Sequence, residues 1–193
     1  MSDNPRDSQL RRRAVRLARS QWGTALAAAW GFAEAVSWPV LPEVALAGLC
    51  VADPRSGPRL SLAAAAGSVA GGLVTYALAE RGVVPPCPLT TRRMHDTVAT
   101  QTRDEGARAV RRQPLAGIPY KVYAARAGKE RVGALSFAQS SARARGTRIV
   151  TAGLALSAFG VAARSQRHRY GPYLLTMGTG FAAALTLIVR GWR

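Results

Sequence analysis

The longest uninterrupted apolar stretch of the chain reads RLSLAAAAGSVAGGLVTYALAE, from Arg59 to Glu80, and carries no charge between its two ends. A helix needs about 20 apolar residues to cross the hydrocarbon core of a bilayer. The pattern therefore predicts a membrane helix over residues 59–80. Small residues recur along it at every fourth position, including Gly67 and Gly71, which is either the packing face for another helix or a chance feature of an alanine-rich segment.

Two further apolar runs lie near the C-terminus, at residues 149–164 and 172–190, on either side of the polar turn RSQRHRYGP. They predict a hairpin of two membrane helices. The first run is short, so Arg148 and Arg164 would have to extend their charged ends towards water. The basic cluster of Arg143, Arg145 and Arg148 precedes this run, and we expect it to act in topology and surface anchoring.

Residues 22–52 are apolar at both ends, but Glu34, Pro39, Pro42 and Glu43 interrupt the centre. Proline removes a helical hydrogen bond and clashes with the preceding turn, which argues against a single straight helix. Two half-length helices that fold back at the prolines fit this pattern better. We expect a re-entrant hairpin whose irregular tip is buried in protein or lined by water, with both glutamates near the tip.

A second apolar island, PLAGIPYKVYAARAG, occupies the centre of residues 112–130 and contains Lys121 and Arg126. It is too short and too charged to cross a membrane alone, and it predicts a second re-entrant hairpin. Within the two hairpins, the segments LPEVALAG, from Leu41, and IPYKVYAARAG, from Ile118, share a proline near the start, an apolar run and a glycine at the end, as in a degenerate inverted repeat at the membrane midplane. The predicted fold class is an all-α integral membrane protein with two opposed re-entrant helical hairpins plus transmembrane helices.

The predicted organisation is a basic cytoplasmic arm over residues 1–21, followed by a single membrane domain over residues 22–193. The arm has no small-residue cleavage site of a signal peptide, and its RRRAVRLAR stretch fits a topogenic signal, a membrane-surface helix or a nucleic-acid arm. The net charge of +17 indicates that an abundant anion, either anionic lipid or nucleic acid, shapes where the protein is located. The long uncharged helices favour anionic membrane lipids over nucleic acid, and they leave homo-oligomers open.

Charged groups at lipid depth cost about 2.5 to 3.5 kcal/mol each, so Glu34, Glu43, Lys121 and Arg126 should be paired, solvated or functional. The functional hypothesis places all four around one cavity, where the two cations attract a phosphate head group and a carboxylate takes up protons. The alternative is a purely structural ion pair.

Catalytic and metal chemistry find no support in the sequence. Cys50 and Cys87 are far apart, and His95 and His168 lie in separate polar segments without metal-binding spacing. The chain has no phosphate-binding loop and no nucleophile elbow. We therefore expect no metal, no cofactor and no enzymatic activity.

Three motifs carry a family resemblance, over roughly residues 23–148. They are FAEAVSWPVLPEV, then GSVAGGLVTYALAERG, and finally GIPYKVYAARAG followed by FAQSSARARGTR. In this order and spacing they resemble the DedA family of SNARE-associated or VTT-domain membrane proteins, and most of all its shorter YqaA-like branch. Pro119-Tyr120-Lys121 stands where many members carry a Phe-x-Pro-x-x-Arg pattern, so substrate identity does not transfer from other branches.

The resemblance implies a protein that moves or scrambles anionic lipids such as polyprenyl phosphates or phospholipids, with proton coupling. The richness in alanine and arginine suggests a high-GC genome, so we expect the plasma membrane of a bacterium. By motif, Glu34 and Glu43 match the acidic positions of the first hairpin, and Lys121 and Arg126 match the basic positions of the second. The helix-packing positions are Gly67, Gly71 and Tyr76. The rival hypotheses are a non-transporting membrane protein that supports envelope integrity or a partner complex, and a soluble basic protein that binds nucleic acid.

Overall fold

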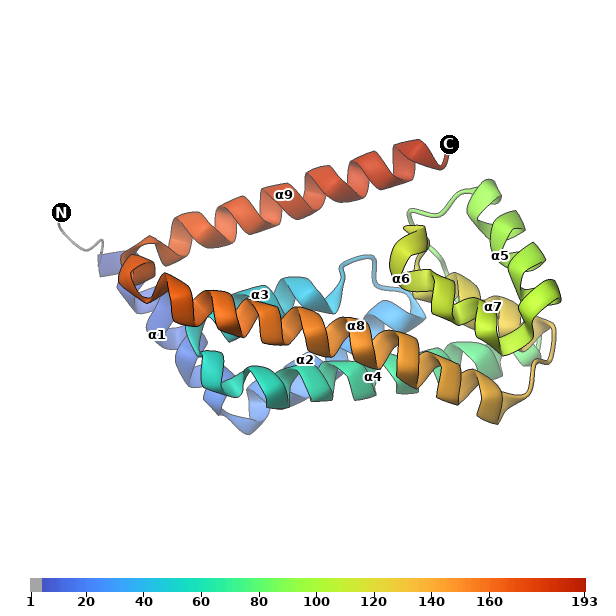
Figure 1. Ribbon diagram of the computed structural model, residues 1–193, viewed down its shortest axis with the longest axis horizontal. Helices are drawn as coiled ribbons and strands as arrows, with labels where there is room; N and C mark the ends of the chain where they lie inside the picture. The colour runs from blue at the N-terminus through green and yellow to red at the C-terminus, as the bar shows by residue number, and fades with distance from the viewer. Residues whose placement is uncertain (1–4) are drawn as a thin grey trace.

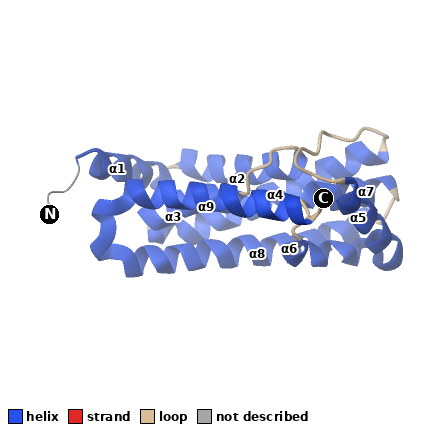
Figure 2. Cartoon of the chain, turned by 90° about the horizontal axis from the view of Figure 1, so that it is seen from above, coloured by secondary structure: helices blue, strands red, loops and turns tan. Residues whose placement is uncertain are grey.

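The computed structural model describes residues 5–193, and across this range the chain is helical, without strands. Residues 1–4 of the predicted N-terminal arm lie outside the described residues. In chain order the helices are α1 (Pro5–Arg19), α2 (Gln21–Val36), α3 (Pro42–Ala52), η1 (Pro54–Ser56), α4 (Gly57–Glu80), α5 (Arg92–Glu105), η2 (Gly106–Arg112), α6 (Gln113–Ala116), α7 (Tyr120–Lys129), α8 (Ala134–Ala162), η3 (Ala163–Arg169) and α9 (Tyr170–Gly191). The longer helices run along a common axis (Figures 1 and 2).

Helices α2 and α3 form an antiparallel hairpin whose tip is residues 37–41 (Figure 1). The hydroxyl of Ser20 accepts a hydrogen bond from the Gly23 amide at 3.1 Å and caps the start of α2. Pro42 occupies the first position of α3, where a proline costs no helical hydrogen bond. The arms have 16 and 11 residues, or about 24 and 17 Å, against about 36 Å for the 24 residues of α4. The hairpin therefore turns back part-way along α4.

The second hairpin consists of η2 and α6 on one side and α7 on the other. Gly117 makes the turn with φ of +65°, a left-handed conformation that favours glycine. The two hairpins meet tip to tip, because the ammonium of Lys121 donates to the backbone carbonyls of Ser37 at 2.7 Å and Trp38 at 3.0 Å.

Helix α4 is the centre of the bundle and packs against α2, α7 and α8. Two of its glycines face α2 so closely that a Cβ at Gly67 would overlap the carbonyl of Ala28, and one at Gly71 would crowd Phe32. Tyr76 lies on a different face of α4, where its hydroxyl donates a hydrogen bond to the backbone carbonyl of Val132. The three predicted packing positions of α4 thus contact α2 and the segment that follows α7.

Two regions differ from the predicted elements. Helix α8 begins at Ala134, fifteen residues before the predicted limit at residue 149, because one face of its polar first half is buried against the bundle. Helix α5 was not predicted, since its sequence is polar on average. It forms because the Thr91 hydroxyl caps its start and because Met94 and Val98 are buried against the second hairpin.

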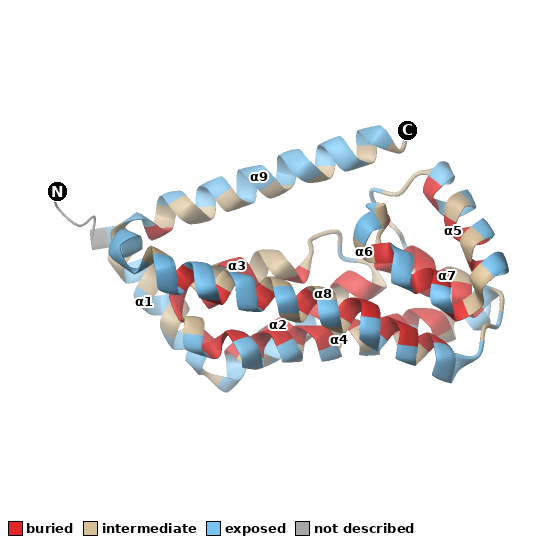
Figure 3. Ribbon diagram, viewed as in Figure 1, coloured by how far each residue is buried: buried red, intermediate tan, exposed pale blue. Residues whose placement is uncertain are grey.

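The end of α8 and the start of α9 are joined by η3, and α9 then returns along the length of the molecule. The hydroxyl of Tyr170 donates to the Gly48 carbonyl at 2.7 Å, and at the other end of α9 the Thr91 hydroxyl donates to the Trp192 carbonyl at 3.0 Å. Between these contacts α9 is largely exposed (Figure 3), including the apolar side chain of Leu175.

Among the described residues, two helical stretches are long and apolar enough to cross a membrane. They are Pro54–Glu80, which contains α4, and Ala134–Gly191, which joins α8, η3 and α9. Helix α1 lies against α3 and α9, with Ala18 fully buried, so the described part of the predicted arm is a packed helix.

Replacing Gly67 with leucine should lower the free energy of unfolding by about 1 to 3 kcal/mol or more, because overpacking would force α2 away from α4. The matched control is Gly178→Leu on α9, where an added Cβ meets nothing within 4 Å. Thermal unfolding of both variants in detergent should show a clear loss for Gly67→Leu alone. Equal melting temperatures would contradict the close contact between α2 and α4.

Candidate functional site

A buried ion pair lies near the point where the two hairpins meet. Glu34, in the last turn of α2, accepts from Arg145 of α8, with 2.5 Å between Oε2 and Nη2. The two side chains are 3% and 0% exposed, so both charges are removed from solvent. The pair links residues 111 positions apart in the sequence.

The other two guanidinium nitrogens of Arg145 also donate hydrogen bonds. Its Nε donates to the Ser68 hydroxyl of α4 at 2.9 Å, and its Nη1 donates to the side-chain amide oxygen Oε1 of Gln113 in α6 at 3.3 Å. The guanidinium carbon lies 5.0 Å from the ring centre of Tyr120 in α7, a favourable cation–π distance. One side chain of α8 therefore contacts α2, α4, α6 and α7.

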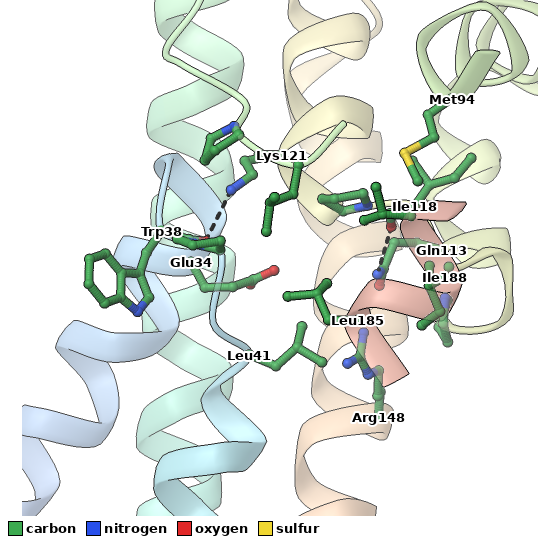
Figure 4. A pocket seen from close by; sticks show the side chains of 17 residues that line it. Glu34, Trp38, Leu41, Met94, Gln113, Ile118, Lys121, Arg148, Leu185 and Ile188 are labelled. Carbon is green, nitrogen blue, oxygen red and sulfur yellow. Dashed lines mark hydrogen bonds between the residues drawn. The ribbon is translucent and has the colours of Figure 1, made fainter. Parts of the chain in front are cut away.

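A cavity of about 200 Å³ adjoins the ion pair. Its walls come from the tips of both hairpins, from α8 and from the C-terminal half of α9, and they are mostly apolar. Figure 4 shows the Glu34 side chain pointing into this space, with Lys121 and Arg148 at its edges. The apolar side chains that line it include Trp38, Leu41, Met94, Ile118, Leu185 and Ile188.

Lys121 is 1% exposed and is held in the cavity wall by the carbonyls of Ser37 and Trp38. These carbonyls follow the last turn of α2, where backbone oxygens have no helical partner. The ammonium of Lys121, in the second hairpin, thus provides hydrogen bonds to two backbone carbonyls at the tip of the first hairpin. It also places a cation next to the Glu34 carboxylate.

Glu43 lies at the start of α3 and pairs with Arg148, with 3.0 Å between Oε1 and Nε. Its side chain is 18% exposed and that of Arg148 is 22% exposed. Of these two residues, Arg148 lines the cavity and Glu43 does not. The pair connects α3 to α8 one turn away from Arg145.

Of the four predicted site residues, Glu43 and Arg126 do not line the cavity. Arg126 pairs with Glu130, the residue that directly follows the end of α7, at 2.5 Å. The single cavity predicted for all four charged residues is therefore lined by Glu34 and Lys121, with Glu43 reached through Arg148.

The sequence prediction for Arg145 was wrong. It was grouped with Arg143 and Arg148 as a surface anchor, yet Arg145 is completely buried. Arg145 and Arg148 are three positions apart and share one face of α8, whereas Arg143 points elsewhere. That spacing was the available signal. The sequence contained no signal that Ser68, Gln113 and Tyr120 would be the partners of Arg145.

The arrangement can bind an anion and exchange a proton. Lys121 and Arg148 supply positive charge at the cavity edges, the Glu34 carboxylate can accept a proton, and the apolar walls can contact a hydrocarbon chain. No family model, curated protein or solved structure matches this chain.

Breaking the buried pair should be strongly destabilising. Arg145→Met leaves the Glu34 carboxylate unpaired, and the free energy of unfolding should fall by about 3 to 5 kcal/mol. The double variant Glu34→Gln/Arg145→Met should lose less than this single variant, because the carboxylate left unpaired in the single variant is then neutral. Thermal or denaturant unfolding in detergent measures both changes.

The control for this cycle is the exposed pair of Arg112 and Glu105, whose side chains are 57% and 30% exposed. Arg112→Met should cost about 1 kcal/mol or less. A loss from Arg145→Met no greater than this would contradict the central role of the buried pair.

Proposed function

We propose that this chain is a DedA-like, multi-pass membrane protein that moves or scrambles anionic lipids, with a polyprenyl phosphate or a phospholipid as substrate. Its proposed location is the plasma membrane of a bacterium. The observation that carries the proposal is the cavity at the hairpin tips, where Glu34, Lys121 and Arg148 stand among apolar side chains. Ionisable groups at membrane depth are rare and mark substrate or ion pathways.

The proposed membrane position follows from the lengths of the helices. Helix α4 and the α8–α9 stretch would cross the bilayer, while the shorter arms of the two hairpins would enter and turn back within it. The irregular tips satisfy each other through Lys121, and irregular backbone is tolerated at membrane depth only when it is buried or lines a cavity. The exposed apolar length of α9 would face lipid.

In the proposed mechanism, a lipid phosphate enters between Lys121 and Arg148 and receives charge-assisted hydrogen bonds. Its hydrocarbon chain follows the apolar wall formed by Leu41, Leu185 and Ile188. Proton uptake by Glu34 would weaken its attraction to Arg145 and so loosen the link between α2 and α8. This step would couple movement of the anion to a proton.

A second candidate is a non-transporting membrane protein that supports envelope integrity or a partner complex. The observation in its favour is that the charges at the cavity already have partners. Glu34 pairs with Arg145, Arg148 pairs with Glu43, and Lys121 is occupied by carbonyls. A network of this kind can also serve only to fix the fold.

Membrane insertion is tested by fractionating the expressing cell and washing the membrane pellet with high salt and then with alkaline carbonate. The protein should stay in the pellet after both washes, because salt screens electrostatic adhesion but does not extract inserted helices. Release by salt alone would overturn the membrane fold and favour the nucleic-acid hypothesis.

Lipid movement is tested in vesicles that contain the purified protein and labelled polyprenyl phosphate or phospholipid. Wild-type protein should accelerate transfer between leaflets, and Arg148→Gln should lower the rate about ten- to a hundredfold, as expected for loss of a hydrogen bond to a charged group.

The comparison variant is Arg126→Gln, which removes an arginine of similar exposure, also paired to a glutamate, but outside the cavity. It should retain most of the rate. Equal losses from the two variants would reject the cavity as the site. No movement by correctly inserted wild-type protein would favour the non-transporting alternative.

A further inference from the structure

The opposite end of the molecule from the hairpin tips holds a second, strongly basic cavity. Helix α1, η1 and the segment from the end of α8 through η3 gather there, at the end where α4 begins and α9 starts (Figure 1). The cavity has a volume of about 470 Å³. Five arginines and one aspartate line it, which gives it a net charge of +4.

The single acid does not neutralise this cluster. Asp53 accepts from Arg19 at 3.1 Å and from the Ser56 hydroxyl at 2.6 Å, so its oxygens are already engaged. Within the described residues, the side chains of Arg11, Arg164 and Arg167 form no ion pair and no hydrogen bond. These three cations come from two segments that are far apart in sequence and converge on one space.

Convergence of like charges is unfavourable without an anion. Partial burial and the neighbouring positive charge of Arg167 lower the pKa of Arg11, while Tyr170 and Asp53 offset part of this effect. A bound anion would remove the repulsion and would supply the hydrogen-bond acceptors that these guanidinium groups lack.

A smaller cavity of about 90 Å³ adjoins the basic one, and Arg11 and Arg167 line both. Its other walls are mainly apolar and aromatic, with Val51, Phe159 and Tyr173 among them. The rings of Phe159 and Tyr173 stack with their centres 5.8 Å apart. A ligand held by the two arginines would therefore meet a polar, basic space on one side and an apolar space on the other.

We propose that this end of the molecule binds an anionic glycerophospholipid, with its phosphate between Arg11 and Arg167 and the start of an acyl chain against Phe159 and Tyr173. The site is separate from the central cavity. It rests only on the membrane insertion in the proposed function, because it lies where α4 and α9 would enter the bilayer. Nucleic acid fits less well, since its hydrophilic backbone leaves the aromatic wall uncovered.

The test uses the full-length protein in a neutral detergent and measures binding of phosphatidylglycerol by native mass spectrometry. Phosphatidylcholine, glycerol phosphate and a single-stranded oligonucleotide serve as comparison probes. Arg11→Gln/Arg167→Gln should weaken phosphatidylglycerol binding about thirty-fold, because each basic residue near an anionic lipid contributes about fivefold. If the double variant fails to fold, Arg167→Gln alone replaces it in the test, because Arg167 is exposed. This single variant should weaken phosphatidylglycerol binding about fivefold.

The control, Arg13→Gln/Arg190→Gln, also removes two exposed charges, one from α1 and one from the last turn of α9, but neither residue lines either cavity. Its affinity for phosphatidylglycerol should change less than twofold. An equal loss in this control would show that net charge alone drives binding, and would overturn the site.

The comparison probes identify the source of the phosphate. Glycerol phosphate that binds as tightly as phosphatidylglycerol would reject a lipid ligand, and an oligonucleotide that depends on the same two arginines would replace it by nucleic acid. Lipid transfer in vesicles is independent of this outcome. Absence of lipid transfer with phosphatidylglycerol binding intact would reject the transport proposal alone. Lipid transfer without phosphatidylglycerol binding at Arg11 and Arg167 would reject the basic site alone.

Discussion

The buried pair of Glu34 and Arg145 is the constraint on which the arrangement of the bundle depends. Moving two charges out of water costs several kcal/mol for each ion, and mutual attraction offsets this only when the remaining hydrogen-bonding groups are satisfied. Arg145 meets that condition through Ser68 and Gln113. Its partners lie on three other helices, so α2, α4, α6 and α8 must reach their positions together for the charge to be tolerated.

The hairpin tips follow the same rule. A helix that ends inside the molecule leaves backbone carbonyls without partners, and in a membrane no water would replace them. Lys121 of the second hairpin satisfies two such carbonyls of the first. Each hairpin therefore needs the other, which explains why two segments more than 80 residues apart meet at their tips and leave a small charged cavity between them.

Local signals account for what the sequence could predict. The uncharged length of α4, the apolar run of α9 and the prolines around residue 40 are each readable within 25 residues, and the observed helices begin and end within a few residues of the predicted limits. Helix α5 and the first half of α8 were missed because they are polar on average. Burial of a few side chains, such as Met94 and Phe137, stabilises them, and it depends on neighbours distant in sequence.

Arg145 and Arg19 show why charge alone could not identify the site. Both belong to arginine-rich stretches and both pair with an acid, yet the side chain of Arg145 is 0% exposed and that of Arg19 is 61% exposed. At the centre of the bundle a buried arginine is tolerated only when its guanidinium nitrogens have partners. At the end of the bundle formed by α1 and η3, where the arginines are more exposed, several can remain unpaired. The high net charge therefore has two physical meanings in one chain: neutralised charge that specifies the fold, and uncompensated charge that is available to bind an anion.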